Sequence, residues 1–288
     1  MPHRVYAILP RTGLANRLFI WARAEVFAEM HNLPVQTIGW GHLHLGPWIR
    51  RERSKRYYRQ FFKPGGNFAQ YISDLATSKI GRKLVKLKQP NASLDLEYPT
   101  SIVFSGRPDK RDYFSGLREH RHFLRKKLME RLRDNITSSV DELPQLDVAV
   151  HVRRGDFTTL GIDIEDKYYL DTLSCIAEKS ERQVSFSIFS DSPKRDLSRI
   201  LDFPGTQYIE SRNDILDMFA IANSRFIVTT NNSTFGFWAA FLSDAKIVLS
   251  SDHKYGPIRD DSSCNALFEG TAEELPSHYF IEPVNSVT

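Results

Sequence analysis

Alternation of short apolar runs with helical patterns in the second half of the chain most restricts the fold. Strand-like runs alternate with segments whose apolar residues recur every three or four positions. Asp214 is the expected N-cap of the third helix, because its side chain can accept a bond from a free N–H. This alternation predicts a mainly parallel sheet with helices on both faces. We expect strands at 147–152, 184–189, 226–229 and 246–249, and helices at 168–179, 196–201, 214–222 and 234–242.

The first forty residues also resemble a strand–helix–strand unit. Val5–Leu9 and Val35–Ile38 are typical of strands, and apolar residues recur every four positions between Leu14 and Met30. Residues 40–140 are basic, aromatic and irregular. Here we expect a strand at 102–104, a charged helix at about 114–135 and a linker at 137–145. The chain should therefore form an α/β enzyme with two Rossmann-like halves, 1–140 and 141–288, facing a cleft.

Composition excludes several classes of protein. The 288 residues are 41% hydrophobic, which is enough for packed cores, and no apolar run approaches the roughly 20 residues that cross a bilayer. The N-terminal run is interrupted too early for a signal peptide, so we interpret it as the first strand. Cys175 and Cys264 are far apart and outside any CxxC pattern, so neither a disulfide framework nor a thiolate zinc site is expected. A cytoplasmic, reducing location fits best.

Positive charge is concentrated in the first half, although the net charge is only +4. Clusters of Lys and Arg lie at about 50–59, 79–88 and 118–133. One interpretation is solvated helix faces; the other is a surface for anionic lipid or an anionic acceptor, which would make the protein peripheral at the inner face of a membrane. Nucleic acid is not expected as a partner, because zinc-finger spacing and RRM-type aromatic motifs are absent from the sequence.

The sharpest local signal is His151-Val-Arg-Arg-Gly-Asp-Phe157, at the end of a predicted strand. Ligands of parallel sheets bind at the carboxyl ends of the strands. Arg153 and Arg154 cannot both point into an apolar core, and their planar guanidinium groups suit phosphate oxygens. The alternative is an arginine pair that bridges carboxylates between the domains.

A second polar segment, Arg11-Thr-Gly-Leu-Ala-Asn-Arg-Leu-Phe19, joins the first strand to the first helix. Such a loop presents free helix N–H groups to a ligand. Asn16 would lie in the first helical turn, where its amide could point into the cleft. The spacing is not GxGxxG, so a nicotinamide cofactor is not indicated. An ordinary helix start explains the segment equally well.

Two more strand ends carry polar groups. In Ile188-Phe-Ser-Asp-Ser-Pro193, Asp191 and the hydroxyls of Ser190 and Ser192 could bind ribose or base edges, or could cap a helix before the proline. In Thr229–Trp238, small polar residues open an apolar helix whose N-terminus suits an anion. Phe237 and Trp238 are expected in the core. The donor-binding candidates in this last segment are Asn231, Asn232, Ser233, Thr234 and Phe235.

No metal site is predicted. The sequence has no Walker A loop, no HExxH motif and no DxD pair, and His42 and His44 suit surface or packing roles. A sugar transferase without a metal needs fixed cations to offset the charge on a leaving diphosphate, and Arg153 and Arg154 could supply them.

Together these motifs resemble the α-1,2-fucosyltransferase family (glycosyltransferase family 11-like) and, more widely, the fucosyltransferase superfamily with an HxRRxD motif. The matching segments are Gly13–Phe19, His151–Asp156, Phe189–Ser192 and Thr230–Leu242, in family order. The middle of the chain, about 40–140, matches no motif of the family. This sequence departs from the family patterns at Ala15, Arg17, Ser192, Asn231 and Gly236.

The resemblance implies a GT-B-like fold, GDP-fucose as donor, inversion at the anomeric carbon and no metal or other cofactor. It makes 1–140 the acceptor-side domain and 141–288 the nucleotide-sugar domain. Arg154 and Arg153 would bind the donor diphosphate, with His151 in the same motif, while the 190–192 and 231–235 segments would face the nucleotide. Asn16 would lie near the junction of acceptor and donor.

An inverting transferase needs a base or a hydrogen-bonded acceptor hydroxyl. Asp156 is the first candidate, although it could instead orient Arg154; Asp163 and Glu165 follow in the next loop. The leading hypothesis is a fucosyltransferase that acts on a bacterial-type surface glycan, within polysaccharide biosynthesis. The alternatives are a transferase of another GDP-sugar on the same fold and a non-catalytic binder of anionic glycans or lipid headgroups.

Overall fold

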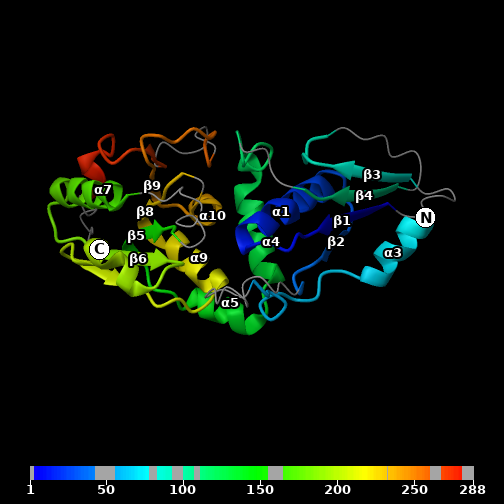
Figure 1. The fold of residues 1–288 in the computed structure, drawn as a ribbon. Helices are drawn as coiled ribbons and strands as arrows, with labels where there is room; N and C mark the ends of the chain where they lie inside the picture. Colours follow the sequence, from blue (N-terminus) through cyan, green and yellow to red (C-terminus); the bar gives the residue numbers. More distant parts are fainter. Residues whose placement is uncertain are drawn as a thin grey trace, which may run out of the picture. The chain divides into compact units, whose positions relative to one another are not determined.

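The structure is a computed structural model of the chain. It divides into two units, Met1–Asp141 with Tyr255–Asp260 and Glu142–Lys254 with Asp261–Thr288. Each unit contains one parallel sheet with helices (Figure 1), so the predicted α/β class with two Rossmann-like halves is confirmed. The return of residues 255–260 to the first unit was not predicted. The structure describes residues 3–42, 56–77, 83–92, 100–106, 111–154, 165–231, 233–259 and 267–280.

The first unit has a four-stranded parallel sheet in the order β2-β1-β4-β3. In its central pairs, Val5 of β1 lies opposite Val35 of β2 and Ile102 of β4. Only part of this was predicted: β3 and α3, which lie in the basic and irregular middle of the chain, were missed. The elements are β1 (Arg4–Ile8), α1 (Leu14–Met30), β2 (Val35–Ile38), α3 (Phe68–Thr77), β3 (Lys83–Leu87), β4 (Thr100–Phe104), η1 (Arg118–His120), α4 (Arg121–Arg131) and α5 (Asp134–Asp141).

Helix α1 is almost entirely buried and forms the main layer on this sheet. Its Phe27 ring lies 5.5 Å from the ring of Phe104 on β4. A smaller cluster of Tyr6, Ile38 and Val103, with Tyr71 of α3 packed against it, covers other strand positions. The predicted four-residue recurrence of apolar side chains in α1 is confirmed. The loop that precedes Leu14 therefore lies at the carboxyl end of β1.

The single helix predicted at about 114–135 is wrong. Helix α4 ends at Arg131, and Leu132 adopts an extended backbone with ψ of 152°. There it forms an antiparallel bridge with Phe62, and the Lys63 N–H donates to the Arg131 carbonyl at 2.8 Å. These bonds replace the next helical ones. The predicted linker 137–145 is also too long, because α5 contains its residues up to Asp141.

The second unit has a six-stranded parallel sheet in the order β10-β9-β8-β5-β6-β7. All four strands and the four helical segments predicted here are present, with shifts of a few residues; the helical segment 196–201 begins as a 3-10 turn. The short strands β7 and β10 were not predicted. The elements are β5 (Leu146–Val152), α7 (Asp166–Lys179), β6 (Phe186–Ser190), η2 (Lys194–Leu197), α8 (Ser198–Leu201), β7 (Thr206–Tyr208), α9 (Asp214–Ala222), β8 (Ser224–Val228), α10 (Thr234–Leu242), β9 (Lys246–Val248), β10 (Glu269–Gly270) and η4 (Ser277–Phe280).

Strand β5 lies at the centre of this sheet, and its Val148, Val150 and Val152 are fully buried against Tyr169 and Leu173 of α7. Phe237 and Trp238 of α10 are also fully buried, as predicted. Burial of the middle of β5 explains its apolar run Val148-Ala-Val150, which lies between the polar residues Asp147 and His151.

The prediction that Asp214 is the N-cap of α9 is wrong. The cap of α9 is Asn213, whose Oδ1 accepts bonds from the N–H groups of Ile215 and Leu216, both at 3.0 Å. Asn213 has an extended backbone, whereas Asp214 is already helical and places a negative charge in the first turn of α9, which suits the helix dipole. Among the residues that the structure describes, no helix is long and apolar enough to cross a bilayer.

Candidate functional site

Arg153 and Arg154 directly follow β5 at the carboxyl edge of the six-stranded sheet. Their side chains are 25% and 14% exposed, respectively. Asp191, which follows the neighbouring strand β6, forms an ion pair with the Arg153 guanidinium and accepts the Arg154 backbone N–H at 3.0 Å. The guanidinium of Arg154 forms an ion pair with Asp166, the first residue of α7. Both arginines therefore contact carboxylates of their own unit.

Ser190 and Ser192 serve the backbone of the same edge. The Ser190 hydroxyl donates to the Val152 carbonyl at 2.7 Å and accepts the Ser192 N–H at 3.1 Å. Pro193 is the N-cap residue of η2, and no side chain caps this helix. The alternative role as a helix cap is therefore wrong, and Ser190 joins the ends of β5 and β6 beside Asp191. Binding of ribose by Ser190, Asp191 and Ser192 stays a prediction.

His151 lies beneath the arginines and is 5% exposed. Its Nδ1 lies 2.8 Å from the Ser233 hydroxyl oxygen, which also accepts the Gly236 N–H at 3.2 Å as the N-cap of α10. The Phe235 ring is 5.2 Å from the imidazole. Burial, and then the charge of Arg153, lowers the pKa of His151 to about 3. The imidazole is therefore neutral at physiological pH and joins the start of α10 to β5.

The remaining predicted donor residues are not all gathered around the arginines. Asn231 is buried and turned toward the loop after β9, where its Nδ2 donates to the Asp252 carbonyl at 2.7 Å and its Oδ1 lies 3.1 Å from Nδ1 of His253. Thr234 and Phe235 are half-buried in the first turn of α10. Asp156, Asn232 and Asp163 lie outside the described residues.

In the first unit, Asn16 lies in the first turn of α1, as the sequence predicted, and it is half-buried. The residue beside it, Arg17, was noted only as a departure from the family pattern. It is fully buried, and its guanidinium donates to the carbonyls of Thr12, Gly39, Trp40 and Arg56 at 2.8–3.1 Å.

Arg17 therefore holds together the loops that follow β1 and β2, and its guanidinium carbon lies 4.8 Å from the centre of the Tyr58 ring. Tyr58 in turn accepts the Leu14 N–H at 2.9 Å, at the start of α1. Nearby, burial and then the charges of Arg17 and Arg11 lower the pKa of His42. Arg17 shapes the turn that presents Asn16.

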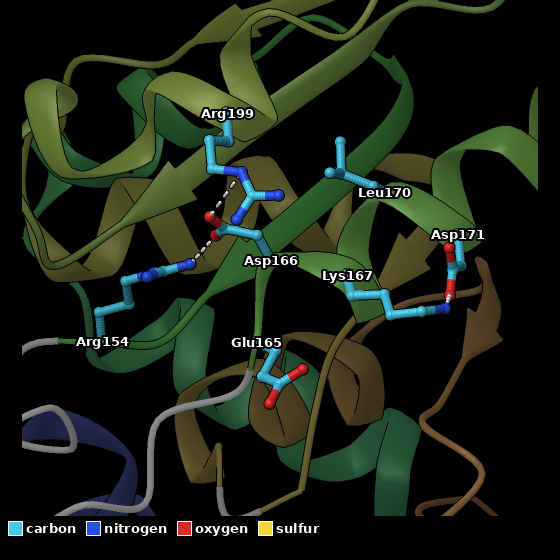
Figure 2. A pocket seen from close by; sticks show the side chains of 7 residues that line it. All are labelled: Arg154, Glu165, Asp166, Lys167, Leu170, Asp171 and Arg199. Carbon is cyan, nitrogen blue, oxygen red and sulfur yellow. Dashed lines mark hydrogen bonds and ion pairs between the residues drawn. The ribbon is translucent and has the colours of Figure 1, made fainter.

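A pocket of about 540 Å³ lies against Arg154 in the second unit (Figure 2). Asp166 and Arg199 in this pocket were missed by the sequence analysis. No motif marks them, because Asp166 begins a helix and Arg199 lies in a short helix, where charged residues are ordinary. Glu165, a runner-up for the base, is exposed and also lines it. The lining residues are Arg154, Glu165, Asp166, Lys167, Leu170, Asp171 and Arg199.

This arrangement suits an anion. Two partly buried arginine side chains follow one strand end, and each is paired with a carboxylate with which an entering phosphate can compete. Among the described residues, no group of three or more His, Cys, Asp or Glu side chains is placed to hold a metal ion.

Comparison with known proteins identifies the family of the chain. The model of the family described as Glycosyl transferase family 11 matches residues 98–254, more than half of the chain. The match spans β5, the arginine pair, β6, α9 and α10. No curated protein matches the sequence significantly.

Solved structures share the fold. Fucosyltransferase NodZ from Bradyrhizobium has a TM-score of 0.53 at 15% identity, covering 86% of this chain and 95% of NodZ. NodZ α-1,6-fucosyltransferase soaked with GDP-fucose has a TM-score of 0.55 at 16% identity, covering 89% and 98%. The predicted GT-B-like fold class is confirmed. With the family match over residues 98–254, the chain belongs to glycosyl transferase family 11 and is a glycosyltransferase.

Proposed function

We propose that this chain transfers fucose from GDP-fucose to a hydroxyl of a glycan acceptor. The observation that carries the proposal is the Arg153–Arg154 pair at the end of β5, in a chain of glycosyl transferase family 11. NodZ, which shares the fold, has been studied with GDP-fucose and with GDP. These relatives support a guanine nucleotide sugar as the donor.

In the proposed reaction, the acceptor oxygen forms a bond to the anomeric carbon while the bond from that carbon to the β-phosphate oxygen breaks. GDP leaves with the electron pair, and the hydroxyl proton passes to a base. Negative charge grows on the diphosphate, and fixed guanidinium groups beside it lower the barrier because they need no reorganisation. Arg153 and Arg154 supply this charge, and the neutral His151 and its partner Ser233 hold the strand end that carries them.

The same arginines are the basis for proposing that no metal and no other cofactor is required. We propose inversion at the anomeric carbon and an α-1,2 linkage on the resemblance of the four motifs to that family, although NodZ is an α-1,6 enzyme. Asp156 is the proposed base, and Asn16 the proposed contact at the junction of acceptor and donor. The linkage is tested by NMR of the isolated product, and an α-1,6 product would contradict this part of the proposal.

We also propose peripheral contact with an anionic membrane at the cytoplasmic face, within polysaccharide biosynthesis. Phe68 and Ile72, one turn apart on α3, are 59% and 47% exposed, and Lys86 and Lys88 of the same unit are exposed. Basic residues near a surface add about 1 kcal/mol each to binding of anionic lipid. Co-sedimentation with vesicles that contain phosphatidylglycerol, but not with pure phosphatidylcholine vesicles, is expected; equal binding to both would contradict an electrostatic contact.

A donor screen in EDTA tests the central proposal. Transfer and hydrolysis are followed with GDP-fucose, GDP-mannose and UDP-sugars, and turnover is expected with GDP-fucose alone. Arg154→Ala should abolish stabilisation by GDP in a thermal shift assay, whereas Arg195→Ala, an exposed arginine on η2, should retain it. Turnover only with a UDP-sugar, or only with added Mn²⁺, would overturn the proposal. Turnover only with GDP-mannose would favour another GDP-sugar.

A further inference from the structure

Asp166 is shared by two arginines. One carboxylate oxygen, Oδ1, forms the ion pair with the Arg154 guanidinium, and the other, Oδ2, lies 3.8 Å from Nε of Arg199 on α8. Figure 2 shows Asp166 between the two arginines, with a contact to each. Lys167 and Asp171 pair with each other to one side, and the Glu165 carboxylate points away from Asp166. The three-residue network thus has two cations and one anion.

The side chains of the two arginines differ in their exposure to solvent. The Arg154 side chain is 14% exposed, whereas the Arg199 side chain is 75% exposed. At 3.8 Å, the Arg199 contact is a loose ion pair without a hydrogen bond. A change of rotamer can bring its guanidinium closer to the carboxylate at little cost, because its present position is mostly in water.

A bound diphosphate changes the balance of this network. If Arg154 turns N–H donors toward phosphate oxygens, Asp166 loses its closest partner. Its side chain is only 16% exposed, so a carboxylate left there without a close cation is destabilised. Arg199 is the described cation that already contacts the other oxygen of the same carboxylate.

We propose that Arg199 is a positioning residue. It becomes the main ion-pair partner of Asp166 when the guanidinium of Arg154 binds a nucleotide diphosphate. This inference rests on the proposed function, because it assumes that Arg154 binds the donor diphosphate. Arg199 then acts through Asp166 and does not contact the donor.

The test measures the affinity for GDP by calorimetry, in EDTA, on the full chain. Arg199→Gln should weaken GDP binding by about 3- to 10-fold, the size expected of a partly exposed ion pair. Arg199→Lys should restore most of the affinity, because a cation is sufficient. The matched control is Arg195→Gln, which removes an exposed arginine one turn earlier that does not line the pocket and should leave the affinity unchanged.

Asp166→Asn separates action through the carboxylate from direct contact. In that background Arg199→Gln should have no further effect, whereas a persisting loss would mean that Arg199 contacts the ligand itself and would overturn the proposal. In the transfer reaction, Arg199→Gln should raise KM for the donor and leave kcat unchanged; an equal fall in kcat would also contradict it. Wild-type binding of GDP with no change in Arg199→Gln would overturn only this inference, and absence of GDP binding by the wild type would overturn the proposed function too.

Discussion

Arg17, in the first turn of α1, and the Arg153–Arg154 pair, directly after β5, lie beside the carboxyl ends of strands in their two units, yet their surroundings differ. Arg17 is fully buried and donates to four backbone carbonyls. Arg153 and Arg154 are partly exposed and contact the carboxylates of Asp191 and Asp166. The nature of the acceptor is therefore what separates a structural arginine from a candidate binding one.

The physical reason is that a ligand can replace one kind of acceptor more easily than the other. The guanidinium of Arg17 cannot turn to a ligand without breaking four hydrogen bonds to carbonyls and taking the guanidinium donor from those of Thr12 and Arg56. A carboxylate at a half-exposed edge can be replaced by phosphate, since both are anions that accept bidentate bonds from arginine. Substitution of Arg17 should therefore act on folding, and substitution of the pair should act on binding.

The largest expected effect is on the first unit. Arg17→Met keeps the length of the side chain but removes four hydrogen bonds, which should lower the free energy of unfolding by about 3–5 kcal/mol. The carbonyls of Gly39 and Trp40 keep the backbone N–H groups of His42 and Tyr58 as donors, whereas those of Thr12 and Arg56 lose the guanidinium donor. Urea unfolding measures this, with Arg11→Met, an exposed arginine of the same loop, as control. A loss below about 1 kcal/mol would remove the distinction between the two kinds of arginine.

A substitution at Gly236 tests the second unit, where close packing at the start of α10 contributes to stability. A Cβ at Gly236 would lie 2.0 Å from the Thr229 hydroxyl oxygen. Gly236→Ala should therefore destabilise the protein by about 1–3 kcal/mol, although alanine favours a helix by about 1 kcal/mol. Adding Thr229→Ala should recover only part of the loss, because the Thr229 Cβ, at 2.9 Å, remains. A stabilised Gly236→Ala variant would show that this contact relaxes freely.

Acid should destabilise the second unit through His151. The pKa of His151 is about 3 in the folded protein and about 6.5 when unfolded, so the unfolded state binds the proton more readily. Stability is complete above pH 6.5 and falls as the pH decreases toward 3, with a loss of about 2 kcal/mol at pH 5. The difference in unfolding free energy between wild type and His151→Gln, measured from pH 7 to pH 4.5, isolates this contribution. Parallel curves for the two proteins would show that the imidazole protonates without cost.

The smallest effect is expected at the arginine pair itself. Arg153→Met, the counterpart of Arg17→Met, should change the unfolding free energy by about 1 kcal/mol or less, because its ion pair with Asp191 is partly exposed. A loss as large as that of Arg17→Met would make Arg153 a structural residue and would weaken its assignment to the donor site.

Much of the second unit was predictable because its elements depend on local patterns. Apolar runs of strand length and three- to four-residue periodicity placed all of its longer elements, and the turn residues placed the polar strand ends. In the first unit the strand predicted at 102–104 is present as β4, but the same procedure failed between 56 and 92. There β3 and α3 are short and amphipathic, and the edge strand β3 depends on pairing with β4 for its stability.

The helix that was predicted to run through Leu132 shows the other kind of failure. Its sequence is compatible with a helix, and the chain turns there because Phe61, Phe62 and Lys63 offer backbone partners to residues 131–133. Those partners lie about seventy positions earlier, beyond the reach of any local pattern. Asn213 and Asp214 differ by one position, and both residue types cap helices, so only the backbone geometry decides between them.

By itself, the sequence determined the two α/β halves, the order of the four motifs and the pair of arginines at the end of β5, because these depend on neighbours within a few residues. Tertiary structure alone decided which acceptor each arginine meets: carbonyls from residues 12, 39, 40 and 56 for Arg17, and the carboxylates of Asp191 and Asp166 for the pair. A guanidinium group binds either kind of oxygen, and which oxygen lies within reach is set by the packing of distant segments.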